Sequence, residues 1–355
     1  MPNAQYRHYA CRITDHSLYK GMRVLFIEND ILRVGILLDK GADIFQLLHK
    51  PTDTDFLWRS PQGLKRPDRF VATRAASAGA FLDSYHGGWQ EILPGGGPVD
   101  YRGAELGLHG EITHLGWEYE IVEDTPECVS VKLSVECIRT PLHLTRTMTL
   151  RLGSPRLLIE EELTNLSPEP QDFMWGHHPA FGAPFLRNGL RLFVPARKVQ
   201  VHTPQFASSG IFEPGLEFDW PLARVGEREF DLSCVPGTEA GFAELLYLKD
   251  LSSGWYAVLD PEKRIGIGLS WPKEIFPYLW FWLVYGRAPG YPWWDRTYCI
   301  ALEPWTSIPN DLNKAIELGT QAQLRGGETL KVSLVATIIT DVDTVNNIDP
   351  SGTVS

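Results

Sequence analysis

The chain has 355 residues, of which 43% are hydrophobic and 22% charged, and it contains 16 Phe, 12 Tyr and 12 Trp. This composition excludes a disordered, collagen-like or coiled-coil protein, because there is enough apolar surface for a large core and no heptad or Gly-X-Y repeat. The formal net charge of −11, without any block rich in Lys or Arg, argues against nucleic acid or an anionic membrane surface as a partner.

The sequence also argues against a membrane protein and against a secreted one. Its longest apolar run, residues 278–286, is much shorter than the ~20 residues that a membrane-spanning helix needs. Residues 1–14 lack the apolar stretch of a signal peptide. The five cysteines are an odd number without a CxxC pair, which argues against a disulfide framework and a structural zinc site. We therefore expect a protein of the reducing cytoplasm.

Alternation of apolar and polar residues predicts β-strands along most of the chain. In chain order, the clearest runs are 129–135, 142–150, 157–163 and 330–335. One helix is predicted over 311–318, with Asp311 as its cap and Gly319 to end it. Many strands joined by short turns, with almost no helical period, predict an all-β fold, a large antiparallel β-sandwich.

We expect one domain over residues 1–340, because no change of composition and no low-complexity linker divides this stretch. Residues 341–355 are predicted to be a polar C-terminal tail with too few apolar residues to pack. Either a monomer or a homodimer fits this organisation.

Three segments interrupt the alternating pattern: 85–111, 175–182 and 301–310. Each combines Gly or Pro with Trp, His or Glu, and irregular segments that join strands are where functional sites tend to lie. The titratable residues of interest in these segments are Glu91, His109, Glu111, His177, His178 and Glu303.

Glu303 follows an apolar run and precedes Pro304, so we expect it where a buried strand ends. From the residues alone, a structural carboxylate and a general base both remain open. Removal from water would raise its pKa and suit it to proton transfer near neutral pH. A proton donor could come from the histidines. Because adjacent strand residues point to opposite faces, only one of His177 and His178 can enter a shared pocket.

Tryptophan is concentrated late in the chain, with seven of the 12 residues between positions 255 and 305. Trp280 and Trp282 share one strand face. That face can belong to the core, or it can line a groove in which indoles cover the apolar faces of a sugar.

We expect no bound metal and no cofactor. The sequence has neither HExxH nor a His-x-His pair, and it lacks a P-loop, a GxSxG elbow and a GxGxxG motif that opens a helix. A metal-dependent sugar isomerase or lyase remains an alternative, because His and Glu are common metal ligands.

Three short motifs resemble those of the aldose 1-epimerases, or galactose mutarotase-like proteins. They are Leu108-His109-Gly110, His178-Pro179-Ala180-Phe181 and Leu302-Glu303-Pro304-Trp305-Thr306, in the family's order. The resemblance covers residues 20–340. It implies a β-supersandwich fold and a cofactor-free isomerisation at the anomeric carbon of a free sugar. Carried over by position, Glu303 would be the base that removes the C1 hydroxyl proton, His178 the acid that protonates the ring oxygen, and His109 a ligand of sugar hydroxyls.

The chain departs from this family in its sugar-binding residues. The Asn-Arg pair that the family has before its first histidine is not evident, with Arg74 upstream as a substitute, and the family's aspartate has only Asp260 and Asp295 as candidates. We expect the 88–91 loop to form one wall of the pocket. The residues predicted to bind the sugar are Arg74, Trp89, Gln90, Glu91, Glu111 and Trp282.

Two alternatives to an isomerase of free sugars stay open. The first is a non-catalytic carbohydrate-binding protein on the same fold, in which the aromatic groove is kept and proton transfer is lost. The second is a sugar-phosphate epimerase, which would need several Arg or Lys residues near the site.

Overall fold

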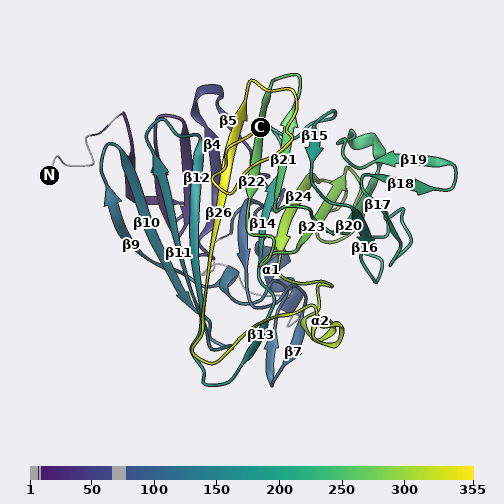
Figure 1. The fold of residues 1–355 in the computed structure, drawn as a ribbon, viewed down its shortest axis with the longest axis horizontal. Coiled ribbons are helices and arrows are strands. Elements are labelled where there is room, and N and C mark those ends of the chain that lie inside the picture. The colour runs from purple at the N-terminus through teal and green to yellow at the C-terminus, as the bar shows by residue number, and fades with distance from the viewer. Residues whose placement is uncertain (1–6, 8, 66–76) are drawn as a thin grey trace.

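A computed structural model describes residues 7, 9–65 and 77–355, and two large antiparallel sheets form the framework of this part of the chain (Figure 1). The predicted all-β fold is confirmed. The strand runs expected at 129–135, 142–150, 157–163 and 330–335 lie within β10, β11, β12 and β26.

The first sheet has 12 strands. Their spatial order is β1 (Arg12–Tyr19), β2 (Met22–Glu28), β3 (Leu32–Leu37), β4 (Asp43–His49), β6 (Trp89–Ile92), β14 (Gly176–Phe181), β24 (Tyr298–Trp305), β23 (Tyr278–Tyr285), β20 (Phe242–Lys249), β16 (Lys198–Val201) and β17 (Glu217–Asp219), with β5 (Thr54–Asp55) beside β4.

The second sheet has eight strands. Their order is β15 (Arg191–Phe193), β21 (Trp255–Asp260), β22 (Ile265–Ser270), β26 (Thr329–Thr340), β12 (Arg156–Asn165), β11 (Leu142–Arg151), β10 (Cys128–Glu136) and β9 (Glu118–Asp124). Three two-stranded sheets pair β7 (Val99–Tyr101) with β8 (Ala104–Leu106), β13 (Gln171–Phe173) with β25 (Ala322–Leu324), and β18 (Leu222–Val225) with β19 (Arg228–Asp231).

The two large sheets pack face to face around the main core. Leu25 and Val34 of the first sheet and Val131, Leu144 and Leu157 of the second sheet belong to one buried cluster. Because a strand turns alternate side chains to opposite faces, the other face of the 12-stranded sheet is free to carry a second cluster. That second cluster contains Trp280, Trp282 and Trp305, and the candidate site lies there.

Helices are short and few in the described part of the chain. They are α1 (Ser77–Ser84) and α2 (Leu312–Leu318), with 3-10 turns at Lys50–Thr52, Ile112–His114 and Thr238–Ala240. α2 is the predicted helix. The Asp311 carboxylate accepts the amide of Lys314 at 3.0 Å, and Gly319 ends the helix in the left-handed region at φ 68°. No helix in the described ranges has both the length and the apolar character needed to cross a membrane.

Residues 341–355 pack against the eight-stranded sheet, which corrects the expected unpacked tail. Val345 and Ile348 are each only 3% exposed and lie in a cluster with Trp255 and Ile339. The carbonyl of Gly352 accepts hydrogen bonds from Thr337 and Arg156. Two well-placed apolar side chains and a few backbone hydrogen bonds are therefore enough to fix this segment, although its composition is polar.

Candidate active site

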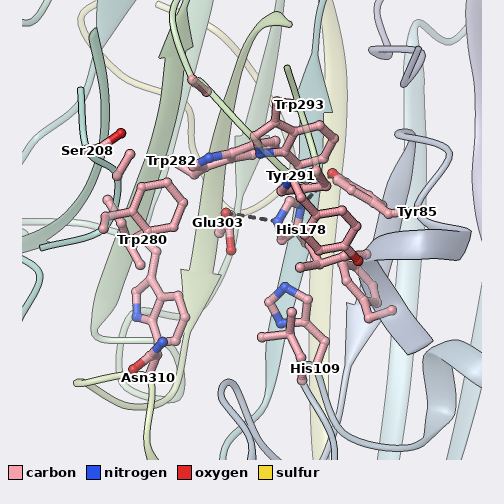
Figure 2. Close-up of a pocket in the computed structure, with 18 of the residues that line it drawn as sticks. Tyr85, His109, His178, Ser208, Trp280, Trp282, Tyr291, Trp293, Glu303 and Asn310 are labelled. Atoms are coloured by element: carbon pink, nitrogen blue, oxygen red, sulfur yellow. Dashed lines mark hydrogen bonds and ion pairs between the residues drawn. The ribbon is translucent and has the colours of Figure 1, made fainter. Parts of the chain in front are cut away.

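A cavity of about 380 Å³ opens on the face of the 12-stranded sheet that points away from the second sheet (Figure 2). It is bounded by β14, β23 and β24, by α1 and by the loops around positions 207 and 290. Its aromatic lining consists of Phe81, Tyr85, Phe206, Trp280, Trp282, Tyr291 and Trp293. Its polar lining adds His109, His178, Ser208, Glu303 and Asn310.

Strand pairing brings Glu303 and His178 together. β14 and β24 are antiparallel neighbours in which Gly176 lies opposite Trp305 and Ala180 opposite Ala301. This register sets Glu303 across from His178, and the distance from His178 Nε2 to Glu303 Oε1 is 3.3 Å. Both side chains are almost fully buried at the floor of the cavity.

Each member of the pair is held by a further aromatic residue. The indole N–H of Trp305 donates to Glu303 Oε2 at 2.9 Å, and Trp305 is itself stacked on Trp280 at a centroid distance of 3.9 Å. On the other side, the Tyr85 hydroxyl lies 3.3 Å from His178 Nδ1. The remaining atoms of the pair, Nε2 and Oε1, therefore face each other and the cavity.

Burial sets the protonation of this pair. Loss of water raises the pKa of Glu303 to about 8, and the Trp305 hydrogen bond opposes this rise only in part. Burial also lowers the pKa of His178 to about 4. Between these values the two residues hold a single titratable proton, and both shifts place it on the Glu303 carboxyl group, next to the neutral imidazole. A site with one mobile proton can both accept and donate a proton.

His109 lies below this pair in Figure 2, with its ring centroid 5.4 Å from that of His178. Its backbone has a left-handed φ of 63°, and Gly110 follows at φ 69°, where a Cβ would overlap the carbonyl of Leu93. Burial lowers the pKa of His109 well below its usual value, so the ring is neutral at pH 7. Its Nδ1 is buried without a hydrogen-bond partner among the described residues, which leaves it available to a ligand hydroxyl.

The predicted wall at 88–91 does not line the cavity. Residues 89–92 form β6 and not a loop, and both faces of this strand are buried. Trp89 points into the main core, where its indole N–H donates to His177 Nδ1 at 3.3 Å. Gln90 donates to the carbonyl of Gly87 at 2.7 Å. The segment at 85–111 interrupts the alternating pattern here because a strand buried on both faces shows no alternation, and not because residues 88–91 form a loop.

Glu91 and Glu111 also lie outside the cavity lining. Glu91 accepts the indole N–H of Trp175 at 2.8 Å and pairs with Arg146 at 3.2 Å between the two sheets. Glu111 accepts the backbone amides at positions 138, 139 and 140 and holds that turn in place. Both carboxylates are thus occupied by the fold itself, which corrects the expectation that they recognise sugar hydroxyls.

The remaining expected residues have different positions. Arg74 lies outside the described residues. Trp282 lines the cavity together with Trp280, as strand alternation predicts. Asp260 lies on the second sheet in an ion pair with Arg187, and Asp295 accepts the backbone amide of Ala288 in the loop beside the cavity.

Four further residues line the cavity although no sequence motif marks them: Tyr85, Tyr291, Trp293 and Asn310. Tyr291 and Trp293 belong to a Gly/Pro/Trp-rich segment at 288–294, and its composition is the one local signal that could have indicated a loop near a site. Tyr85 directly follows α1, and its contact with His178 joins residues 93 positions apart. Such a contact leaves no local pattern.

One group of described residues could hold a metal ion by its side-chain types. Glu91, Glu161 and His177 place their ligand atoms within 4.8 Å of one another. However, Trp89 donates to His177 Nδ1, so the ring proton lies on Nε2 and is directed to Glu161 at 3.1 Å. The Arg146 guanidinium also lies on Glu91. This donor set suits a shared proton between two carboxyl groups better than a cation.

The fold is the one found in galactose mutarotase-like proteins. A "putative aldose 1-epimerase" from Klebsiella pneumoniae matches with a TM-score of 0.75 at 18% identity, over 95% of this chain and 86% of that one. Galactose mutarotase-like proteins from Clostridium acetobutylicum and Lactobacillus casei match with TM-scores of 0.64 and 0.59 at 15% and 17% identity. They cover 94% and 89% of this chain and 99% of each of theirs. At identities this low, the structural similarity establishes the fold alone, and it confirms the predicted resemblance at the level of the fold.

The chain belongs to the family described as "Domain of unknown function (DUF4432)", whose model matches residues 19–338. No curated protein matches it in sequence.

Proposed function

We propose that this protein is an aldose 1-epimerase-like isomerase that interconverts the anomers of a free sugar. The observation that carries the proposal is the buried pair of Glu303 and His178, 3.3 Å apart on the floor of a cavity. The hydroxyl oxygen and the ring oxygen of a pyranose are bonded to the same anomeric carbon. A base for one and an acid for the other must therefore lie close together, as these two side chains do.

The reaction follows from the single proton of the pair. Transfer of this proton from Glu303 to His178 Nε2, across 3.3 Å, gives the reactive form. Glu303 then accepts the proton of the C1 hydroxyl while the C1–ring-oxygen bond breaks and the ring oxygen takes the proton from His178 Nε2. Rotation about the C1–C2 bond turns the other face of the aldehyde toward the ring hydroxyl. Reclosure returns both protons in the opposite sense, and the net change is one of configuration only.

The cavity also offers groups that could orient a sugar. The indole N–H of Trp282 and Nδ1 of His109 are both buried without partners among the described residues, so each is available to a hydroxyl. The close approach of Glu303 and His178 favours proton transfer over the alternative of binding alone. No Lys or Arg of the described residues lines the cavity, which does not favour a sugar phosphate.

The test is NMR of freshly dissolved α- and β-anomers of several free aldoses, in which the protein should speed the exchange between anomers. In Glu303→Gln the shape is kept and the base is lost, so kcat should fall by ~10²–10⁴-fold with little change in KM. Glu111→Gln is the matched control, because Glu111 is also buried but holds the turn at 138–140 outside the cavity lining. A Glu303→Gln protein that keeps most of its turnover would contradict the proposal.

A further inference from the structure

The two oxygens of the Glu303 carboxyl group have different partners. Glu303 and Trp305 are two positions apart on β24, so their side chains lie on the same face of the strand. The Trp305 indole N–H donates to Glu303 Oε2 at 2.9 Å. The other oxygen, Oε1, lies 3.3 Å from His178 Nε2. Oε1 is therefore the oxygen that can take part in proton transfer, whereas Oε2 is occupied by the indole.

The indole ring of Trp305 is fixed by both strands that neighbour β24. Gly176 of β14 lies opposite Trp305, and a Cβ at this position would overlap the indole ring. From β23, Trp280 stacks on Trp305 with a centroid distance of 3.9 Å and an interplanar angle of 13°. Trp280 is itself held, because its indole N–H donates to the carbonyl of Ser307 at 3.0 Å. Trp305 is fully buried, so its N–H keeps one orientation and no bulk water competes for it.

This hydrogen bond acts on the proton that Glu303 and His178 share. In the reactive form, Glu303 is ionised and His178 carries the proton. An N–H donor stabilises an ionised carboxylate more than a carboxylic acid, so the Trp305 N–H favours the reactive form. It thereby opposes the rise that burial causes in the pKa of Glu303. Because the donor is already oriented, it does not have to move when the negative charge forms.

We propose that Trp305 is a positioning residue for the base. Its indole N–H holds Oε2 of Glu303, leaves Oε1 for proton transfer and stabilises the ionised carboxylate. This inference rests on the proposed function, which makes Glu303 the base. A purely structural role would need only the ring of Trp305, which packs among buried aromatic residues. The proposed role needs the N–H as well, and this difference can be measured.

The kinetic test is Trp305→Phe, which removes the N–H and keeps an aromatic ring. We expect kcat for anomer exchange to fall about tenfold with little change in KM. The alkaline limb of the pH profile should move upward by about one pH unit, because the pKa of Glu303 rises when the donor is lost. Trp271→Phe is the control, because the buried Trp271 donates to the carbonyl of Phe276 at 2.9 Å, outside the cavity lining. A kcat within twofold of the wild type, or a lower kcat with an unmoved alkaline limb, would overturn the inference.

A second substitution keeps the shape of the side chain and serves if Trp305→Phe does not fold. In 3-benzothienylalanine a sulfur atom replaces the indole N–H and the two fused rings are kept. Placed at position 305, this residue can still stack on Trp280 but cannot donate to Glu303. It should lower kcat and move the alkaline limb as Trp305→Phe does. Wild-type values of both would show that only the ring matters and would contradict the inference.

A measurement without sugar separates failure of this inference from failure of the proposed function. In protein labelled with ¹⁵N at tryptophan, the Trp305 indole signal is assigned by its absence from Trp305→Phe. Its proton shift should follow the ionisation of Glu303, with a midpoint near pH 8, and this titration should vanish in Glu303→Gln. A Trp305 signal that does not titrate, or that titrates equally in Glu303→Gln, would refute the inference. If no sugar shows faster exchange, the isomerase proposal fails, and this titration alone decides whether Trp305 holds the ionised carboxylate.

Discussion

The shared proton of Glu303 and His178 makes the proposed activity depend on pH in two directions. Below a pH of about 4, both groups are protonated and no base remains, because burial lowers the pKa of His178 to about 4. Above about 8, both are deprotonated and no acid remains, because burial raises the pKa of Glu303 to about 8. We expect a bell-shaped kcat/KM profile between these limits after subtraction of the uncatalysed exchange. A profile that rises or falls across the whole interval would contradict the pairing.

Tyr85 is a positioning residue for His178. Its hydroxyl forms a hydrogen bond with Nδ1 at 3.3 Å, which orients the ring so that Nε2 faces Glu303. Tyr85→Phe removes that hydrogen bond while it keeps the ring. We expect kcat to fall about tenfold, KM to change little and the acid side of the pH profile to move. Tyr291→Phe is the control, because the Tyr291 hydroxyl bonds to Asp83 and not to His178. Equal effects in both variants would argue against positioning.

At the scale of the secondary-structure elements, β14 gives the adjacent residues His177 and His178 different roles, because their side chains point to opposite faces of the strand. His178 faces the cavity, whereas His177 faces the core and bonds to Glu161 at 3.1 Å. His178→Ala should therefore lose most of the activity and stay folded. His177→Ala should keep activity per folded molecule but lose about 1–3 kcal/mol of stability, because a buried partner is left unpaired. Activity assays and chemical denaturation of both variants measure these effects. Loss of activity in His177→Ala, with activity kept in His178→Ala, would show that β14 turns the other histidine to the cavity.

Sequence reasoning predicted the elements that have one clear period. In β10, Lys132 is exposed while Val131 and Leu133 are buried, so alternation is visible in the sequence. β6 is buried on both faces and has four residues, so it has no alternation, and Gly87 and Gly88 before it look like a loop. α1 has too few turns to show a helical period.

The candidate site could likewise be predicted only where a local sequence pattern marks its residues. Such patterns mark four residues that the structure brings into one cavity: Glu303, His178, His109 and Trp282. Tyr85 and the loop at 288–293 reach the cavity through contacts between distant parts of the chain. The predicted sugar ligands Glu91 and Glu111 failed because a carboxylate near a site in sequence can be used entirely by the fold.

At the scale of the whole molecule, one buried polar network joins the two sheets behind the candidate site. Glu91 and His177 come from the 12-stranded sheet, and Arg146 and Glu161 come from the eight-stranded sheet. Because the guanidinium of Arg146 is buried with Glu91, removing one member would leave a charge without compensation. The network therefore contributes to the packing of the two sheets against each other.

This network makes the stability of the whole molecule depend on pH. Burial raises the pKa of Glu91 to about 8 and that of Glu161 to about 7, from a usual value of 4.5. The folded state thus keeps protons that the unfolded chain has released, and the stability that they provide is lost as the pH rises toward 8. Burial lowers the pKa of His177 from 6.5 to about 4. This shift makes the stability rise with pH, but only below a pH of about 6.5.

We therefore expect the free energy of unfolding to fall between pH 6.5 and pH 8, where Glu91 and Glu161 titrate together with Glu303 and where His177 does not. Each carboxyl contributes a slope of at most ~1.4 kcal/mol per pH unit. Glu161→Gln cannot ionise and should flatten the slope, whereas Glu162→Gln, on the outer face of the same strand, should leave it unchanged. Chemical denaturation at several pH values measures the slope. Stability that rises over this interval, or equal slopes in the two variants, would show that the network does not hold the proton.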